Sequence, residues 1–313
     1  MPITRRAVLA AAILTLTATT GTLAQSPGPT AFSAPSVDCQ PVAIDPAVAL
    51  TVDVDGVTRE ARVHAPAVAN GSLRPLVLAF HGYGGGFWDL EYAGGLSDAA
   101  DANGFVVAYP QGIGEGPTWD LEGDTDIAFV GALIDDLVAS QCVDSTRVFA
   151  TGFSMGGGMT NVLACRLADR FAAVAPVAAN HGETWGEPCA PSQPVPVVAF
   201  HGTLDTFLPY EGGESPFPDR PVTGVEEWMA EWAAADGCAA GPTVTSVSAE
   251  VDSLVWQDCA APVALYRVLG GGHTWPGGVN DPSFGVTTDD ISATELMWAF
   301  FADAAPRVLA PAQ

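Results

Sequence analysis

The chain contains no lysine, and its positive charge comes from 11 arginines against 36 aspartates and glutamates, for a formal net charge of −25. An acidic surface of this strength repels phosphate backbones, so we expect no nucleic-acid partner. Solubility is sufficient to explain the acidic excess, and a neutral substrate or a saline habitat is the alternative explanation. Charge of this kind does not define a fold.

Long apolar runs are absent after the first 24 residues. Those residues combine Arg5 and Arg6 with the apolar run "AVLAAAILTLTATT" and small residues up to Ala24, which is the pattern of a cleaved export signal. We therefore expect a signal peptide at 1–24, an extended Pro-, Ser- and Ala-rich arm at 25–47, and one domain at 48–313. Both general and twin-arginine export fit the signal. The mature protein is expected to be a secreted or periplasmic monomer without a membrane anchor.

Cysteine is scarce, and none of the six residues has the spacing of a zinc site, so neither a metal nor another cofactor is expected. An even number of cysteines in an exported chain predicts disulfides. Cys238 and Cys259 are the best candidate pair, because the segment between them has the pattern of a compact hairpin.

Apolar runs that alternate with helical patterns predict the fold. Near-continuous apolar runs are typical of parallel strands that are covered on both faces, and strand–helix alternation predicts a three-layer α/β sandwich. The predicted buried strands are residues 75–80, 104–110, 147–153, 171–177, 195–200 and 263–269.

Helices are predicted between these strands. Ile127, Val130, Ile134 and Leu137 recur at helical spacing. The sequences "TGVE" (223–226) and "SATE" (292–295) match capping boxes, each opening an apolar-faced helix, and Gly237 is a suitable end for the first of these.

The stretch "TGFSMGGG" places Ser154 directly after the strand "RVFATGF" and before a glycine-rich helix start. This is the context of the nucleophile elbow of α/β-hydrolases, in which glycines leave room for a cramped turn. The helix N-terminus also directs backbone N–H groups toward developing negative charge. A glycine-rich helix start without catalytic function produces the same motif. The motif therefore indicates a nucleophile only if the chain also supplies a base, an acid and an oxyanion site.

A serine nucleophile needs a base and an acid, which follow it in the order Ser, acid, His in this fold. His273, in "GGGHTWPGG", is the last of five histidines and lies in a glycine-flanked loop after a strand. Asp205, in "HGTLDTFLPY", follows a buried strand, unlike Asp219 and Asp236. Packing or loop-shaping roles explain the remaining histidines, His64, His81, His181 and His201, and Asp252 and Asp258 belong to the cysteine-bounded hairpin.

An oxyanion hole is predicted at "HGYGGG" (81–86), which follows an early strand and is similar to the HGGG motif of esterases. The backbone N–H groups of Tyr83 and Met155 are its expected donors. The other glycine-rich loop, "GIGEG" (112–116), lacks the GxGxxG spacing and a following helix, so it predicts a loop that lines the cleft rather than a phosphate site.

Taken together, "HGYGGG", "FSMGGG", "HGTLDTFLPY" and "GGGHTWPGG" resemble the secreted α/β-hydrolases known as polyhydroxybutyrate depolymerases, which are related to feruloyl and acetylxylan esterases. The resemblance covers roughly residues 50–305. It implies an α/β-hydrolase with Ser154 as nucleophile, Asp205 as acid and His273 as base. It also implies that Trp275 lies near the acyl pocket and that Asp126 corresponds to an aspartate that is common in the family at this place in the chain.

The expected function is hydrolysis of carboxylic esters through an acyl-enzyme, with small esters or short polyester (hydroxyalkanoate) oligomers as substrates. A feruloyl or acetylxylan esterase is the alternative, and an acyltransferase or a non-catalytic binding module on the same fold are further ones. Tyr83, Trp119, Trp185, Phe207 and Trp275 are candidate pocket aromatics, although each is equally suited to the core or the rim.

Overall fold

A ten-stranded sheet forms the centre of the fold in the computed structural model, which describes residues 39–45, 48–67, 72–179, 189–216 and 219–306. The strand order is β1-β2-β4-β3-β5-β6-β7-β12-β11-β10. The six strands from β4 to β12 pair in parallel. An antiparallel pair extends each edge, β2 with β1 at one and β11 with β10 at the other.

The elements alternate along the chain as the apolar runs predict. The strands are β1 Leu50–Val54, β2 Val57–His64, β3 Arg74–Phe80, β4 Val106–Pro110, β5 Val143–Phe153, β6 Ala173–Val177, β7 Val197–Gly202, β8 Gly213–Pro216, β9 Asp219–Val222, β10 Ala240–Ser246, β11 Val251–Gln257 and β12 Val263–Val268. The helices are α1 Phe87–Gly94, α2 Leu96–Asn103, α3 Thr125–Ser140, α4 Met155–Arg166, α5 Val225–Ala235, α6 Ala293–Asp303 and the short 3₁₀ helix η1 Pro282–Phe284.

The predicted strands are confirmed, with shifted ends. The largest shift is in β5, which begins at Val143 rather than Arg147. Three polar residues, Asp144, Ser145 and Thr146, precede the predicted start, yet the strand continues back through them to Val143, which pairs with Arg74 of β3 across a register shift. Tertiary pairing therefore extends this strand beyond its apolar run.

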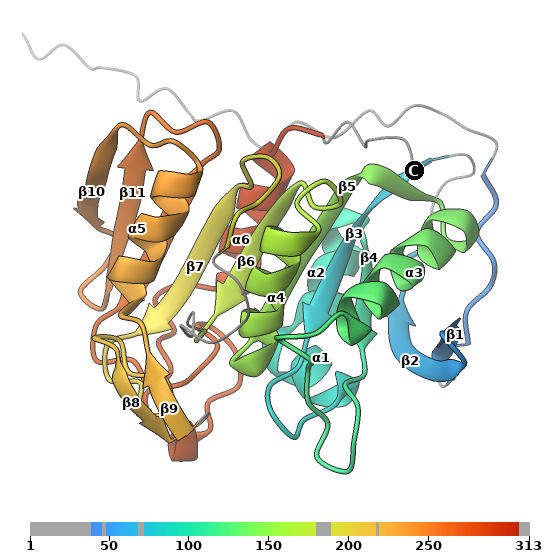
Figure 1. Cartoon of the computed structure of the whole chain (residues 1–313), viewed down its shortest axis with the longest axis horizontal. Helices are drawn as coiled ribbons and strands as arrows, with labels where there is room; N and C mark the ends of the chain where they lie inside the picture. The colour runs from blue at the N-terminus through green and yellow to red at the C-terminus, as the bar shows by residue number, and fades with distance from the viewer. Residues whose placement is uncertain (1–38, 46–47, 68–71, 180–188, 217–218, 307–313) are drawn as a thin grey trace, which may run out of the picture. The chain divides into compact units, whose positions relative to one another are not determined.

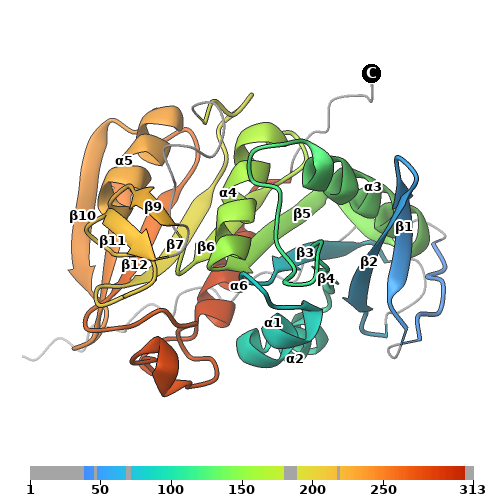
Figure 2. The ribbon, with the colours of Figure 1, turned by 60° about the horizontal axis from the view of Figure 1, so that its bottom comes forward.

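Helices cover both faces of the sheet, which gives the predicted three layers. Figures 1 and 2 show α3, α4 and α5 on one face and α1, α2 and α6 on the other. Alternation within β3 separates the two cores: Leu76, Leu78 and Phe80 pack on the first side, whereas Val77 and Ala79 pack on the second. Burial on both faces is the physical reason that β3 is apolar at every position after Arg74 and Pro75.

The two predicted capping boxes have different outcomes. Ser292 is the N-cap of α6 and accepts a hydrogen bond from the N–H of Glu295 at 3.2 Å, as predicted. The predicted cap at Thr223 is wrong, because α5 starts at Val225 with Gly224 as its N-cap and no side-chain cap. Gly237, with φ of 66°, follows the end of α5 as expected.

Three disulfides join all six cysteines: Cys39–Cys142, Cys165–Cys189 and Cys238–Cys259. The third is the predicted pair, and it closes the β10–β11 hairpin. The first ties residues 39–45, the described part of the predicted arm, to the end of α3. These residues form neither helix nor strand, and the N–H of Val42 donates to the carbonyl of Ser140 at 2.9 Å.

The predicted signal peptide lies outside the described residues. By its internal contacts the chain divides into Met1–Ala31 and Phe32–Gln313, and the sheet and its helices belong to the second unit. Within the described ranges, no helix combines the length and the apolar character needed to traverse a bilayer.

Candidate active site

Ser154 occupies a strained turn between β5 and α4. Its backbone has φ of 56° and ψ of −121°, in the region that non-glycine residues rarely adopt. The N–H of Ser154 donates to the carbonyl of Val177 on the neighbouring strand at 3.0 Å, which fixes the turn from the side.

Glycines on both sides of Ser154 are required by close backbone contacts. A Cβ atom at Gly152 would lie 2.2 Å from the carbonyl oxygen of Gly156, and one at Gly156 would lie 2.0 Å from that of Phe80. No side chain fits at these distances, so the glycines of the motif serve the turn itself and present Ser154 at the carboxyl end of the sheet.

Asp205 follows β7 in a buried position, 5% exposed. One carboxylate oxygen, Oδ1, accepts hydrogen bonds from the N–H groups of Phe207 and Leu208, both at 2.8 Å. The other, Oδ2, lies 2.7 Å from Nδ1 of His273 and 3.3 Å from Nε2 of His201. All of these groups lie at the carboxyl ends of β7 and β12, which are adjacent in the sheet.

The pKa of Asp205 is set by two opposing effects. Burial alone would raise it, but the hydrogen bonds and charges of His201 and His273 outweigh burial, and the pKa is lowered far below its ordinary value. Asp205 is therefore a carboxylate at neutral pH, able to hold the proton on Nδ1 of His273 and leave Nε2 to act as a base.

Aromatic side chains hold the ring of His273. The ring packs against Phe153 at 4.8 Å and Phe207 at 5.0 Å between ring centroids, and the backbone N–H of His273 donates to the carbonyl of Phe284 at 2.7 Å. Phe153 immediately precedes Ser154, so this packing places the imidazole beside the serine turn. The structure thus brings together Ser154, Asp205 and His273 from three separate strand ends.

His201 is a member of this cluster that the sequence did not indicate. Its Nδ1 lies 3.0 Å from the carbonyl of Ala179 and its Nε2 lies 2.9 Å from the carbonyl of Leu208. The sequence signal was only an "HG" at a strand end, four residues before Asp205. Its contact with the acid depends on how the chain turns between them.

The loop at 81–86 lies against the serine turn. The Cβ of Ser154 is 3.4 Å from the position that a Cβ at Gly82 would take. Tyr83 follows Gly82, and Met155 is the first residue of α4, whose N–H has no acceptor within the helix. Both predicted oxyanion donors thus belong to segments that border Ser154.

His81 controls the orientation of this loop. Its Nε2 accepts a hydrogen bond from the N–H of Gly112 at 3.0 Å, so the proton resides on Nδ1, which donates to the carbonyl of Gly82 at 2.7 Å. Burial lowers the pKa of His81, which favours this neutral form. Because a peptide unit is planar and trans, fixing the carbonyl of Gly82 also fixes the direction of the Tyr83 N–H.

A cavity of about 380 Å³ adjoins His273 and the 81–86 loop. Its wall is largely aromatic and apolar, with two acidic residues. The lining residues are His81, Gly82, Tyr83, Gly85, Asp89, Leu90, Tyr92, Ala93, Phe153, His273, Thr274, Trp275, Val279, Asp281 and Phe284. Tyr92 and Phe284 were not singled out from the sequence, because neither is part of a motif.

The predicted pocket aromatics have different positions. Tyr83 lines the cavity and is 63% exposed, while Trp275 lines it from a buried position and donates from Nε1 to Thr294 at 3.0 Å. Phe207 packs on His273 but is absent from the described cavity wall. Trp185 lies outside the described residues.

Trp119 requires a correction. The prediction that it faces substrate is not supported, because its side chain is 3% exposed and lies outside the described cavity lining. Instead its Nε1 donates to the carbonyl of His81 at 2.8 Å and its ring packs edge-on against Phe80. The loop 112–116 that precedes it likewise supports His81 through Gly112 and is absent from the described cavity wall.

Asp126 has a structural contact, because it forms a buried ion pair with Arg59 at 2.6 Å.

Among the described residues, no group of three or more His, Cys, Asp or Glu side chains is arranged to hold a metal ion.

Fold and site together define an α/β-hydrolase. A family model described as "Esterase PHB depolymerase" matches residues 61–199. "Putative esterase NocK" of Nocardia uniformis subsp. tsuyamanensis is 36% identical over 88% of this chain and 91% of that protein. The chain belongs to this esterase family, and it is a carboxylic ester hydrolase.

Two further proteins are similar over different extents. Feruloyl esterase B of Piromyces equi is 33% identical over 64% of this chain, but that match spans only 39% of the fungal protein. The structure of an acetyl xylan esterase from Aspergillus awamori has a TM-score of 0.59, with 18% identity, covering 78% of this chain and 94% of that one. At this identity the structural match supports the fold alone.

Proposed function

We propose that this esterase uses Ser154 as its nucleophile, His273 as general base and Asp205 as the acid that orients the base. One observation carries the proposal: Asp205 Oδ2 lies 2.7 Å from His273 Nδ1, and the imidazole packs on the residue that precedes Ser154. This is the geometry by which a histidine with a fixed tautomer activates a serine hydroxyl.

The reaction then has two halves. Ser154 Oγ attacks the ester carbonyl carbon while Nε2 of His273 takes its proton, and the alcohol leaves with that proton. Water attacks the acyl-enzyme, again giving a proton to His273, and the carboxylate product departs as Ser154 is restored. The N–H groups of Tyr83 and Met155 would hold the oxyanion in both halves, and each such donor contributes about 3–4 kcal/mol in comparable sites.

The cavity supports an apolar acyl group as the substrate's acid part. Its volume of about 380 Å³ suits one acyl unit, and Asp89 and Asp281 in its wall disfavour an anionic substituent. Short hydroxyalkanoate oligomers fit this description through their terminal unit. Hydroxycinnamoyl esters are the second candidate, and the ring-bearing wall of Tyr83, Tyr92, Trp275 and Phe284 is the observation that favours them.

Export is proposed on two grounds. The first 24 residues have the pattern of a signal peptide. All six cysteines are paired, which is typical of proteins in oxidising compartments. The proposed mature protein is therefore extracellular or periplasmic.

The test compares wild-type mature protein with Ser154→Ala on p-nitrophenyl butyrate, methyl ferulate and 3-hydroxybutyrate oligomers. We expect kcat/KM to fall by roughly 10³-fold or more in the variant, because the activated hydroxyl is lost. Ser253→Ala, on the remote strand β11, is the matched control and should retain wild-type turnover.

The relative rates on the three substrates distinguish the two acyl classes. Added glycerol tests the acyltransferase alternative, since an alcohol that competes with water would raise the release of p-nitrophenol. Equal turnover by wild type and Ser154→Ala would refute the nucleophile. Wild-type protein that is folded yet inert on all three esters would instead favour a binding module.

A further inference from the structure

Three arginines of this acidic protein are almost completely buried: Arg59, Arg74 and Arg147 are 5%, 2% and 4% exposed. Arg59 pairs with Asp126 at 2.6 Å and Arg147 pairs with Asp144 at 2.7 Å. Arg74 forms no ion pair with any residue that the structure describes. Among the arginines whose side chains the structure describes, it is the exception, since Arg62, Arg166, Arg170 and Arg267 also pair with carboxylates.

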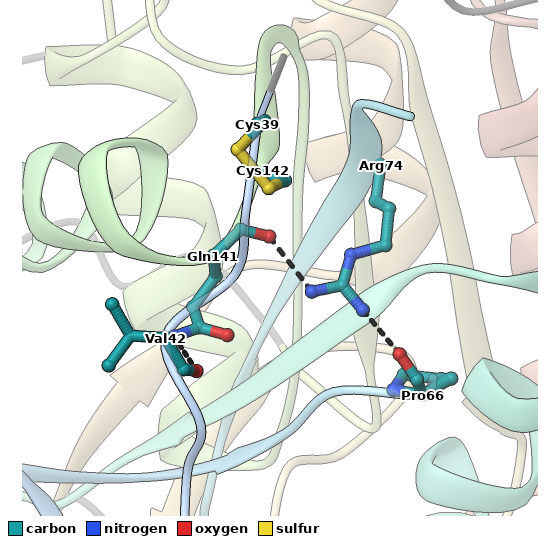
Figure 3. The surroundings of a disulfide bond; sticks show 6 residues. All are labelled: Cys39, Val42, Pro66, Arg74, Gln141 and Cys142. Atoms are coloured by element: carbon teal, nitrogen blue, oxygen red, sulfur yellow. Dashed lines mark hydrogen bonds between the residues drawn. A yellow bond between two sulfur atoms is a disulfide. The ribbon is translucent and has the colours of Figure 1, made fainter. Parts of the chain in front are cut away.

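Among the described residues, only backbone carbonyls accept hydrogen bonds from the Arg74 guanidinium. Nη1 donates to the carbonyl of Pro66 at 2.6 Å and Nη2 donates to that of Gln141 at 2.8 Å (Figure 3). Nε has no hydrogen-bond partner. A guanidinium has five N–H donors, so these two bonds leave more than half of its donors unused. Burial lowers the pKa of Arg74, and no nearby acid offsets that effect.

A cavity of about 320 Å³ lies beside this unpaired cation. Residues 41–44 form one wall and residues 63–67 form another, with Arg74 and Gln141 completing it. Figure 3 shows the guanidinium between Gln141 and Pro66, with the edge that joins its terminal nitrogens turned toward the space between Pro66 and Val42. No Asp or Glu is present among the residues that line the cavity.

The walls of the cavity restrict the kind of anion that fits. Arg74 provides one fixed positive charge in a fork that matches a planar carboxylate. His64 is also in the wall, but its Nε2 lies 2.9 Å from the carboxylate of Asp101. This nitrogen is therefore already engaged and does not serve as a second partner for an anion. The remaining surface includes the apolar side chains of Val42, Ile44 and Val63. A single charge beside apolar side chains in a wall of mixed polarity favours a singly charged ligand with a short hydrocarbon tail over phosphate or a dicarboxylate.

We propose that this cavity is a binding site for a small monocarboxylate, whose two oxygens accept hydrogen bonds from Arg74 and whose tail packs between residues 41–44 and 63–67. The site is separate from the serine site, because Arg74 begins β3 whereas the serine site lies at the carboxyl ends of the parallel strands. The disulfide Cys39–Cys142 and the bond from Gln141 Nε2 to the carbonyl of Val42, at 3.0 Å, keep the wall of residues 41–44 in place.

The test is thermal unfolding in increasing sodium butyrate, with total ionic strength held constant by sodium chloride. Ligand that binds only the folded state raises the Tm in a saturable way. Butyramide, which is neutral and nearly the same shape, is the matched ligand control. The variants are Arg74→Met, Arg74→Lys, which retains the charge but loses the fork, and Arg170→Met as a control at a surface arginine paired with Asp135.

We expect wild type and Arg170→Met to respond alike to butyrate and not to butyramide. In Arg74→Lys, and in Arg74→Met if it folds, the half-saturating butyrate concentration should rise about tenfold or more, because the bidentate contact is lost. An equal response in wild type and Arg74→Lys would overturn the proposal, since butyrate would then be binding elsewhere, for example at the serine site. A wild-type Tm that butyrate raises no more than chloride does would overturn it as well.

Discussion

At the scale of single residues, Asp205 is the most tightly coordinated group of the site. Two N–H groups bind one of its oxygens and two histidines approach the other. These four partners fix the position of the carboxylate, so a change in any one of them alters the orientation of His273. In the proposed mechanism His201 is therefore a positioning residue for the acid, and it would act on the reaction only through Asp205.

The lowered pKa of Asp205 predicts how its contribution to stability depends on pH. A carboxylate whose folded pKa is depressed stabilises the protein above its unfolded pKa, near 3.9, and loses that contribution as the pH falls toward its folded pKa. The difference in free energy of unfolding between wild type and Asp205→Asn should therefore be larger at about pH 5 than at more acidic pH. It should shrink below about pH 4.

Urea unfolding of both proteins across this range measures that difference, and turnover at pH 7.5 measures the catalytic effect. We expect kcat to fall by on the order of 10³–10⁴-fold in Asp205→Asn, because the amide cannot fix the tautomer of His273. A stability difference that grew as the pH fell below about 4 would contradict the depressed pKa.

Sequence patterns could select these proposed catalytic residues because order and flanking glycines restrict the choice. Ser154, Asp205 and His273 each follow a recognisable strand, and chain order then selects among the acids. Arg74 and His201 carried no such signal. Their significance depends on which groups surround them after folding, and no motif encodes the absence of a counter-ion.

At the scale of elements, the turn between β5 and α4 depends on backbone atoms that approach one another more closely than any side chain permits. Gly156 is the critical residue, because the carbonyls of Phe80 and His81 occupy the place of its Cβ. Those carbonyls belong to the end of β3 and the start of the 81–86 loop, so the same contact sets the distance between the serine turn and that loop.

Gly156→Ala should therefore destabilise the protein by about 3 kcal/mol or more, because backbone must move to accommodate the methyl group. Gly131→Ala is the matched control: Gly131 lies within α3, and no atom comes within 4 Å of its Cβ position. There alanine should stabilise the protein by about 1 kcal/mol through helix propensity. Urea unfolding gives both values. Equal effects at the two glycines would show that crowding at the turn is unimportant.

At the scale of the whole molecule, the disulfides close chain loops of very different length. Cys39–Cys142 spans 103 residues and attaches residues 39–45 to the end of α3, whereas Cys238–Cys259 spans 21 residues within one hairpin. Because loop closure restricts the unfolded chain more when the loop is longer, these two bonds should contribute unequally.

Replacing both cysteines of each pair by alanine tests this. In the chain-entropy view the loss is about 4.7 kcal/mol for Cys39–Cys142 and about 3.3 kcal/mol for Cys238–Cys259. The variant without Cys39–Cys142 should therefore lose more free energy of unfolding than the variant without Cys238–Cys259. A smaller loss for the long loop would indicate that its unfolded state is already compact.

The sequence by itself determined the layers of the fold and the identity of the proposed catalytic residues. Apolar runs specify buried parallel strands, and a parallel sheet brings all its carboxyl ends to one edge, so residues that follow those strands must converge. Tertiary structure alone decided which groups surround each of them: two histidines on Asp205, Trp119 behind His81 rather than in the cavity, and Arg74 without a carboxylate. Burial and pairing depend on segments as far as 200 residues apart, such as Thr294 and Gly94, and local patterns carry no information about such distances.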